Sequence, residues 1–283
     1  MKYEDIIGRS FSNSMTAKLK QVSHFDRYQK YLIVCLNVIS HHISPKLSDR
    51  LFKSFISGGE VSDEKLWKCV MLARATFYWY GTATYSEFMR RLSRKDFETA
   101  FEEVLAASYF HRSGWEVIAK PETGVKQGDF DFRLKRNGST LNVEVTSIHA
   151  SSFSEGAIFN KLGKKRRQLP PDEPGIIYCS LPESWGLHRS QESNRLLEEI
   201  AMAFMRSTNR VVAVMFAMNF HYDRLAHGPI DVASKRRATL SLIFENLDPI
   251  VPVDLRSINA QNFVAYPRSE LDKWFEWLLW QAE

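Results

Sequence analysis

The chain has 283 residues, 44% of them hydrophobic and 13% aromatic, which is enough to bury a core and argues against a disordered chain. The net charge of +5 suits a polyanionic partner without establishing one. The longest apolar runs, 31–39 and 211–218, fall short of the roughly 20 residues that span a bilayer, and the N-terminus lacks a secretory signal. Three cysteines without metal-ligand spacing, Cys35, Cys69 and Cys179, are expected to be buried thiols. We therefore expect a cytoplasmic protein with no membrane partner.

Two patterns follow one another along the chain. Between about residues 25 and 92, apolar residues recur every three or four positions, which predicts helices. From residue 94 onward helices alternate with strands, so we expect an α/β domain, 94–283, with a mixed sheet flanked by helices, preceded by a helical N-terminal region, 1–93. The elements predicted in that domain are a helix over 94–113, strands in WEVIAKPE, DFDFRLK and TLNVEVTS, a helix over 159–169, a strand in GIIYCSLP, a helix over 193–207 and a strand in RVVAVMFAMNF.

The pair Asn137-Gly138 lies between two alternating strands and is a strong signal for a type I′ hairpin turn, which needs positive φ at both positions. With these residues in the turn, Arg136 pairs with Ser139. Counting outward, Asp131 pairs with Glu144, and Asp129 with Thr146. The other face of the hairpin is then entirely apolar and carries Phe130, Phe132, Leu134, Leu141, Val143 and Val145.

The predicted pairing of Asp131 with Glu144 needs an explanation, because carboxylates directly opposed across two strands destabilise a sheet. A divalent cation with oxygen ligands, Mg²⁺ or Mn²⁺, would stabilise such a pair. The alternative is an edge hairpin whose acids simply point into solvent. The continuous apolar strands that follow, 175–182 and 211–218, imply a covered sheet and favour a cleft over an open surface.

This succession of residues resembles the PD-(D/E)XK nuclease superfamily, which has a restriction-endonuclease-like fold. In that family a helix with a Glu precedes a hairpin that carries an Asp and then Glu-x-Lys. The resemblance covers about residues 97–182. It implies that Asp131 and Glu144 are catalytic metal ligands together with the Val145 carbonyl. Further ligands are expected among the acids of the preceding helix, Glu98, Glu102 and the neighbouring Glu103, with Asp129 as another candidate.

The sequence departs from the family at Thr146, where the motif has Lys. The following segment, FNKLGKKRRQL, offers substitutes, because Lys161, Lys164 or Lys165, and Gln168 share one face of a helix. We expect Lys161 to take the place of the motif lysine, with Gln168 as a polar helper. The basic residues of this segment are expected to contact a phosphate backbone: Lys164, Lys165, Arg166 and Arg167.

The resemblance implies a Mg²⁺- or Mn²⁺-dependent nuclease that hydrolyses phosphodiester bonds, with DNA the favoured substrate, in a defence or mobile-element setting. The first 93 residues would then serve recognition or assembly. Cutting both strands with one site per chain would favour a homodimer. The alternative that Thr146 supports is a degenerate member of the same fold, which binds nucleic acid or a protein partner without cleavage.

Overall fold

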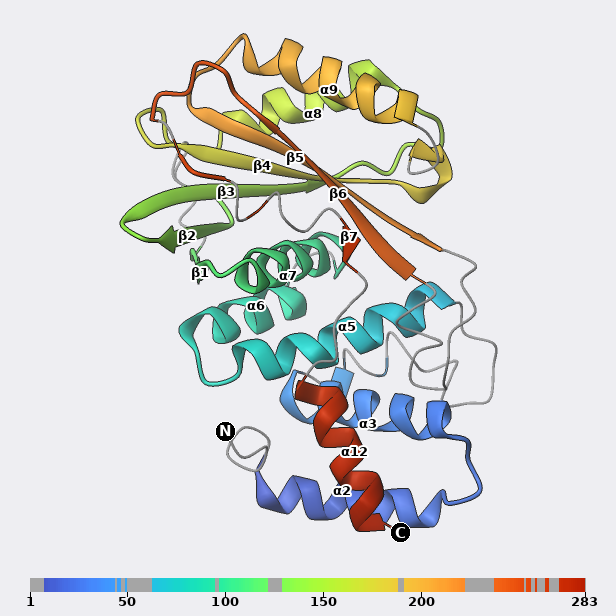
Figure 1. The fold of residues 1–283 in the computed structure, drawn as a ribbon. Coiled ribbons are helices and arrows are strands. Elements are labelled where there is room, and N and C mark those ends of the chain that lie inside the picture. The colour runs from blue at the N-terminus through green and yellow to red at the C-terminus, as the bar shows by residue number, and fades with distance from the viewer. Residues whose placement is uncertain are drawn as a thin grey trace. The chain divides into compact units, whose positions relative to one another are not determined.

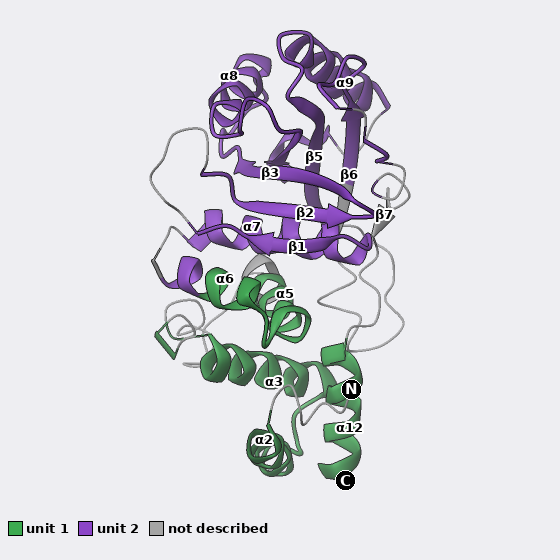
Figure 2. Ribbon diagram, turned by 90° about the vertical axis from the view of Figure 1, so that its left-hand side faces the viewer, with its two compact units in different colours: residues 1–89, 221–238, 265–283 green, residues 90–220, 239–264 purple. Residues whose placement is uncertain are grey.

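In a computed structural model, the described residues are 8–43, 45–46, 49, 63–94, 97–121, 129–187, 191–221, 237–251, 253–255, 258, 263–264 and 270–282. The chain divides into two compact units (Figure 2). Unit 1 comprises residues 1–89, 221–238 and 265–283, and unit 2 comprises residues 90–220 and 239–264. No helix among the described residues is long and apolar enough to cross a membrane.

Unit 1 is helical. It contains α2 (Arg9–Gln21), α3 (Arg27–His42), α5 (Asp63–Trp79), the first half of α6 (Ala83–Arg94) and α12 (Glu270–Ala282). A capping box starts α3, because the Asp26 carboxylate accepts the Gln29 amide at 2.8 Å while the Gln29 side chain accepts the Asp26 amide. Trp274 and Leu278 are buried where α12 packs on α2 and α5, so the amphipathic C-terminal helix belongs to the core.

A buried ion pair joins these helices. The Asp272 carboxylate of α12 accepts two hydrogen bonds from Arg74 Nη2 of α5, at 2.9 and 3.2 Å. It also accepts the hydroxyl of Tyr31 from α3. Because all three side chains are buried, the cluster ties the last helix of the chain to two early ones.

The division of the chain differs from the ranges 1–93 and 94–283. The first boundary lies within a few residues of the predicted one, inside α6. The C-terminal helix, however, packs with the N-terminal helices, although we placed it in the second domain. The difference arises from Asp272 and Trp274, whose partners lie some 200 residues earlier and leave no local signal.

Unit 2 is a seven-stranded mixed sheet in the order β1-β2-β3-β4-β5-β6-β7. The helices α8 and α9 cover one face and α7 lies on the other (Figure 1). The predicted α/β class, a mixed sheet flanked by helices after a helical N-terminal region, is confirmed. The elements are α7 (Phe97–Arg112), β1 (Glu116–Ala119), β2 (Phe132–Arg136), β3 (Ser139–Ser147), α8 (Glu155–Arg166), β4 (Gly175–Leu181), the short 3-10 helix η1 (Glu183–Trp185), α9 (Gln191–Met205), β5 (Val211–His221), β6 (Arg237–Glu245) and β7 (Phe263–Val264).

The hairpin register is the predicted one. Asn137 and Gly138 both have positive φ, 48° and 80°, as a type I′ turn requires. Arg136 pairs with Ser139 and the antiparallel ladder continues to Phe132 opposite Val143. Beyond the hairpin β3 pairs with β4 in parallel, so β3 is the strand at which the sheet changes direction.

The pairing ends before the predicted contact of Asp131 with Glu144. The Asp131 amide donates to the Val143 carbonyl at 3.0 Å, although Phe132 is already the partner of Val143. Two residues of the first strand thus face one residue of the second, which is the arrangement of a β-bulge. The bulge reverses the alternation: Phe130 joins the core beneath α8 and α9, while the Phe132 ring meets Phe110 of α7. The prediction that Phe130 and Phe132 share a face was therefore wrong.

Candidate active site

The candidate site lies where β2 and β3 part. β3 continues past Val143 with β4 as its neighbour, while β2 ends at the bulge. The Asp131 side chain fills the gap in the ladder, because its Oδ2 accepts the Val145 amide at 2.7 Å. A side-chain carboxylate thus occupies a position that a strand carbonyl would normally take, and the bulge re-aims Asp131 along the edge of β3.

Glu144 and Lys165 form the second part of the site. Glu144 is 1% exposed, on the face of β3 that α8 covers. Lys165, in the last turn of α8, donates from Nζ to Glu144 Oε1. Lys165 of the following helix therefore contacts Glu144, whereas the sequence analysis assigned the role of the missing lysine to Lys161.

Arg91, from the last turn of α6, forms the third part, and the sequence patterns did not reveal it. Its Nη1 donates to Glu103 Oε2 of α7 at 2.6 Å and lies 3.4 Å from Asp131 Oδ1. Its Nη2 donates to the backbone carbonyls of Asp131, at 3.1 Å, and Lys120. Both Arg91 and Glu103 are 1% exposed, so this guanidinium joins α6, α7 and the bulge from within the core.

Among the described residues, the ion pairs of the site join three acidic side chains and two basic ones. Glu103 is paired with Arg91 and Glu144 with Lys165, while Asp131 shares Arg91 at the longer distance. Burial raises the pKa of Asp131 well above its ordinary value, and Glu144 and Glu103 raise it further against the lowering effects of Lys165 and the Val145 amide. Burial alone would lower the pKa of Lys165, but Glu144, Asp131 and Glu103 outweigh it and raise the pKa. Burial and the neighbouring acids therefore favour the protonated, neutral form of Asp131.

Two further residues predicted for the site, Glu102 and Lys161, influence the buried thiol of Cys179 on β4. Burial raises its pKa to about 12; Lys161 and Lys165 counteract the rise, and Glu102 adds to it. Glu102 of α7 and Lys161 of α8 therefore lie within electrostatic range of Cys179. All three cysteines are buried free thiols, as predicted.

The helix that carries the lysines starts earlier than predicted and ends sooner. The Ser154 hydroxyl accepts the Ala157 amide at 3.2 Å and caps α8, which ends at Arg166. Gln168 lies beyond the helix end, in a turn where its amide donates to the Lys165 carbonyl, so it does not continue the helical face of Lys161. The predicted helical position of Gln168 was wrong.

The remaining predicted residues are spread around this centre. Glu98 is half-buried in the first turn of α7, Asp129 is half-buried before the bulge, and Thr146 is buried on β3. Lys164 and Arg167 are exposed and free to meet a polyanion. Arg166 instead donates to the Ser207 carbonyl and hydroxyl at 3.1 Å, so it fastens α8 to the end of α9.

The donor set fits a magnesium ion only in part. Among the described residues, no group of three or more His, Cys, Asp and Glu side chains is arranged to hold a metal. Mg²⁺ is, however, commonly held by one or two carboxylates, with water and substrate phosphate completing its shell. Asp131 and Glu144, whose carboxylates lie close enough to repel one another, offer such a pair of oxygen ligands.

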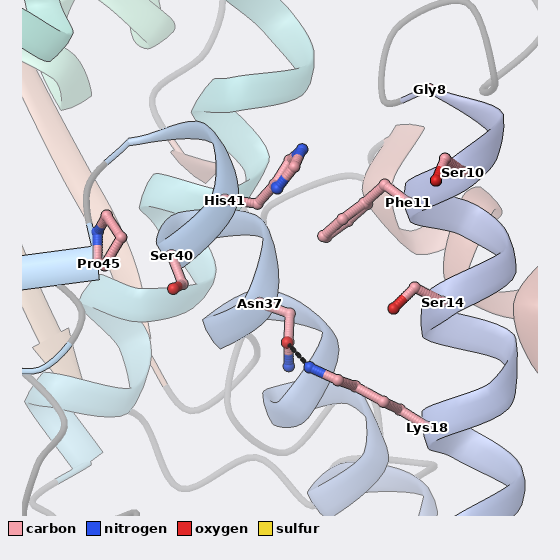
Figure 3. Close-up of a pocket in the computed structure, with 9 residues that line it drawn as sticks. All are labelled: Gly8, Ser10, Phe11, Ser14, Lys18, Asn37, Ser40, His41 and Pro45. Carbon is pink, nitrogen blue, oxygen red and sulfur yellow. Dashed lines mark hydrogen bonds between the residues drawn. The ribbon is translucent and has the colours of Figure 1, made fainter.

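A concave region lies in unit 1 between α2 and α3 (Figure 3). It has a volume of about 550 Å³, and Lys18 of α2 donates to Asn37 of α3 across it. No carboxylate occurs among the described residues that line it, so it lacks the chemistry of the site at β3. The polar side chains around it are Ser10, Ser14, Lys18, Asn37, Ser40 and His41.

No family model, curated protein or solved structure matches this chain. The likeness to PD-(D/E)XK nucleases therefore rests on the residues at the end of β3.

Proposed function

We propose that the protein is a divalent-metal-dependent nuclease of the PD-(D/E)XK type, with DNA as the favoured substrate. One observation carries the proposal: Asp131, Glu144 and Lys165 come from a bulge, a strand and the next helix, and form one cluster in which both acids are buried and the lysine is partly exposed. Perturbed ionisable groups gathered where strands diverge are typical of catalytic sites. The positions of Asp131 and Glu144 relative to the hairpin are those of the family motif.

In this proposal each residue has a defined task. Asp131 and Glu144 would hold Mg²⁺ or Mn²⁺, and the Val145 amide keeps Asp131 oriented by its hydrogen bond. The bound cation would supply Lewis acidity at the scissile phosphate and lower the pKa of the attacking water. Lys165 would stabilise the charge that develops on the phosphate oxygens. The water oxygen bonds to phosphorus as the ester P–O bond breaks, leaving a phosphate monoester and a hydroxyl. Lys164 and Arg167 would contact the backbone of the nucleic acid.

The proposal is tested by incubating the purified full chain with plasmid DNA, linear DNA and RNA in Mg²⁺, Mn²⁺ or EDTA. The matched variant is Glu144→Gln, which keeps the size of the side chain and removes its charge. Cleavage that needs metal and disappears in this variant supports the proposal. Cleavage that survives in Glu144→Gln places the activity elsewhere or in a contaminant.

A second candidate is a nuclease-fold protein that binds nucleic acid without cutting it. The observation that favours it is that Arg91 and Lys165 already contact the two motif carboxylates, Asp131 and Glu144. Binding of DNA that is unchanged by EDTA, with no cleavage of any substrate, would favour this candidate over the nuclease.

A further inference from the structure

The guanidinium of Arg91 is fixed in its place by contacts that do not depend on any ligand. It donates to the Glu103 carboxylate and to two backbone carbonyls, those of Lys120 and Asp131. At 1% exposure it cannot move into solvent without opening the core. Its position 3.4 Å from Asp131 Oδ1 is therefore a built feature of the site.

This positive charge lies beside a predicted cation site, where it works against cation binding. Arg91 is strongly paired with Glu103 and only weakly engaged with Asp131, so it partly compensates both carboxylates. A divalent ion at Asp131 would meet the repulsion of this fixed charge in a poorly solvated environment, where such interactions are strong. Replacing Arg91 by a neutral side chain leaves two buried carboxylates that need a cation from outside.

We propose that Arg91 is the resident counter-ion of the carboxylate cluster, stabilising the metal-free site and lowering its affinity for divalent cations. The part that concerns metal rests on the proposed function. Arg91 is a positioning residue in this scheme, because it acts through Asp131 and Glu103. The affinity of the site for metal is thus set by competition between a fixed arginine and the bound ion.

The test measures Mn²⁺ binding to the full chain by electron paramagnetic resonance, without substrate and independently of activity. Arg91→Met keeps much of the side-chain length without its charge, and we expect it to bind Mn²⁺ at least about 10-fold more tightly than the wild type. Arg195→Met is the control, because it removes the same charge from an exposed i,i+4 pair with Glu199 on α9. We expect less than about a 2-fold change there, since exposed charges are screened.

Glu103→Gln provides a result of opposite sign that does not require Arg91→Met to fold. With Glu103 neutral, Arg91 compensates Asp131 alone, and the affinity for Mn²⁺ should fall at least about 3-fold. Folding of every variant is checked by circular dichroism. Where the wild type binds Mn²⁺, a folded Arg91→Met protein that binds it no more tightly overturns the proposal, and so does tighter binding in Glu103→Gln.

Failure of the proposed function gives a different pattern. If the wild type and every variant bind no Mn²⁺, the metal-dependent nuclease is abandoned and the counter-ion role is decided by melting in EDTA. In that case Arg91→Met should melt well below the wild type, and Arg91→Met/Glu103→Gln should regain part of the loss, because no uncompensated pair of carboxylates remains. A double variant that melts lower than Arg91→Met overturns the counter-ion role as well.

Discussion

Each unit buries an arginine against carboxylates, but the two clusters differ in their charge balance. In unit 1 the guanidinium of Arg74 meets one carboxylate, Asp272, which also accepts the hydroxyl of Tyr31. In unit 2, Arg91 and Lys165 form a second cluster with three carboxylates, those of Glu103, Asp131 and Glu144. In the part of the chain that the structure describes, the first cluster thus pairs one acid with one base, whereas the second joins three acids to two bases.

This difference separates a structural role from a functional one. A buried pair such as Arg74–Asp272 adds little net stability, but removing one partner is costly because the other charge stays buried. The Arg74–Asp272 pair joins α5 to α12, and neither charge requires a ligand. An excess of buried carboxylate, as around Asp131, lowers stability unless a proton or a cation neutralises it, and proteins retain such strain mainly at functional sites. Replacing the aspartate by asparagine should therefore lower the unfolding free energy in the first cluster, and leave it nearly unchanged or raise it in the second.

Asp131→Asn tests the second cluster and has the largest expected effect. Cleavage should fall about 10³-fold, equivalent to about 4 kcal/mol of transition-state stabilisation, because a metal ligand loses its charge. The unfolding free energy should change by less than about 1 kcal/mol or rise, since the amide oxygen can still accept the Val145 amide. Initial cleavage rates and urea denaturation measure the two quantities. A large loss of stability would show that Asp131 is primarily structural.

Asp272→Asn is the matched change in the first cluster. It leaves the buried Arg74 charge uncompensated, so the unfolding free energy should fall by about 3 kcal/mol. Urea denaturation followed by tryptophan fluorescence measures the loss, with Glu270→Gln on the exposed first turn of α12 as the control. A loss below about 1 kcal/mol for Asp272→Asn would remove the contrast between the two clusters.

Lys165→Met distinguishes the observed lysine from the predicted one. Because Lys165 contacts Glu144, its loss should lower the cleavage rate about 10²-fold, as for other single groups that stabilise transition-state charge. Lys161→Met, one turn earlier on α8, should lower the rate less than about 3-fold. Rates at saturating DNA compare the two variants. The reverse order would assign the motif lysine's role to Lys161.

The elements recognised from the sequence are those that local chemistry determines. Asn137-Gly138 can form only a few turns, and the turn in which both residues have positive φ determines the register of β2 and β3. Buried thiols and the α/β order follow from apolar periodicity in the same way. The bulge at Asp131 and the contacts of Arg91 could not be inferred from local patterns in this way. The bulge at Asp131 has no local signature.

Arg91 and Lys165 depend on tertiary contacts. Arg91 lies on a helix that reads as part of the N-terminal helical region, and its role appears only when α6 meets Glu103 and the bulge. The choice of Lys165 over Lys161 depends on where Ser154 starts α8 and on how that helix packs against β3. Asp131 and Glu144 were therefore predictable from the hairpin, and Lys165 was one of the candidates in the following helix, while Arg91 was not predictable.

The smallest expected effect is on pH dependence, where the two units should respond in opposite directions. In unit 1 burial, with a contribution from His41, lowers the pKa of His42 from 6.5 to about 4. The unfolded chain then takes up a proton below pH 6.5 while folded His42 stays neutral, so its stabilising contribution is present above pH 6.5 and is lost as the pH falls toward 4. Because His42 is partly exposed, we expect a loss of only about 1 kcal/mol.

In unit 2 the pKa of Asp131 is raised, so the folded state binds the proton more readily than the unfolded chain. Its contribution is complete below the unfolded pKa of about 4 and is lost as the pH rises through the folded pKa. Urea denaturation between pH 4 and 7, in EDTA, separates the two groups: His42→Gln should remove the loss on acidification, and Asp131→Asn should remove the gain. The sign of each difference is the test, because a change in packing alone would shift stability equally at every pH. If both variants change the pH dependence of the unfolding free energy in the same direction, then His42 and Asp131 do not determine how stability responds to acid.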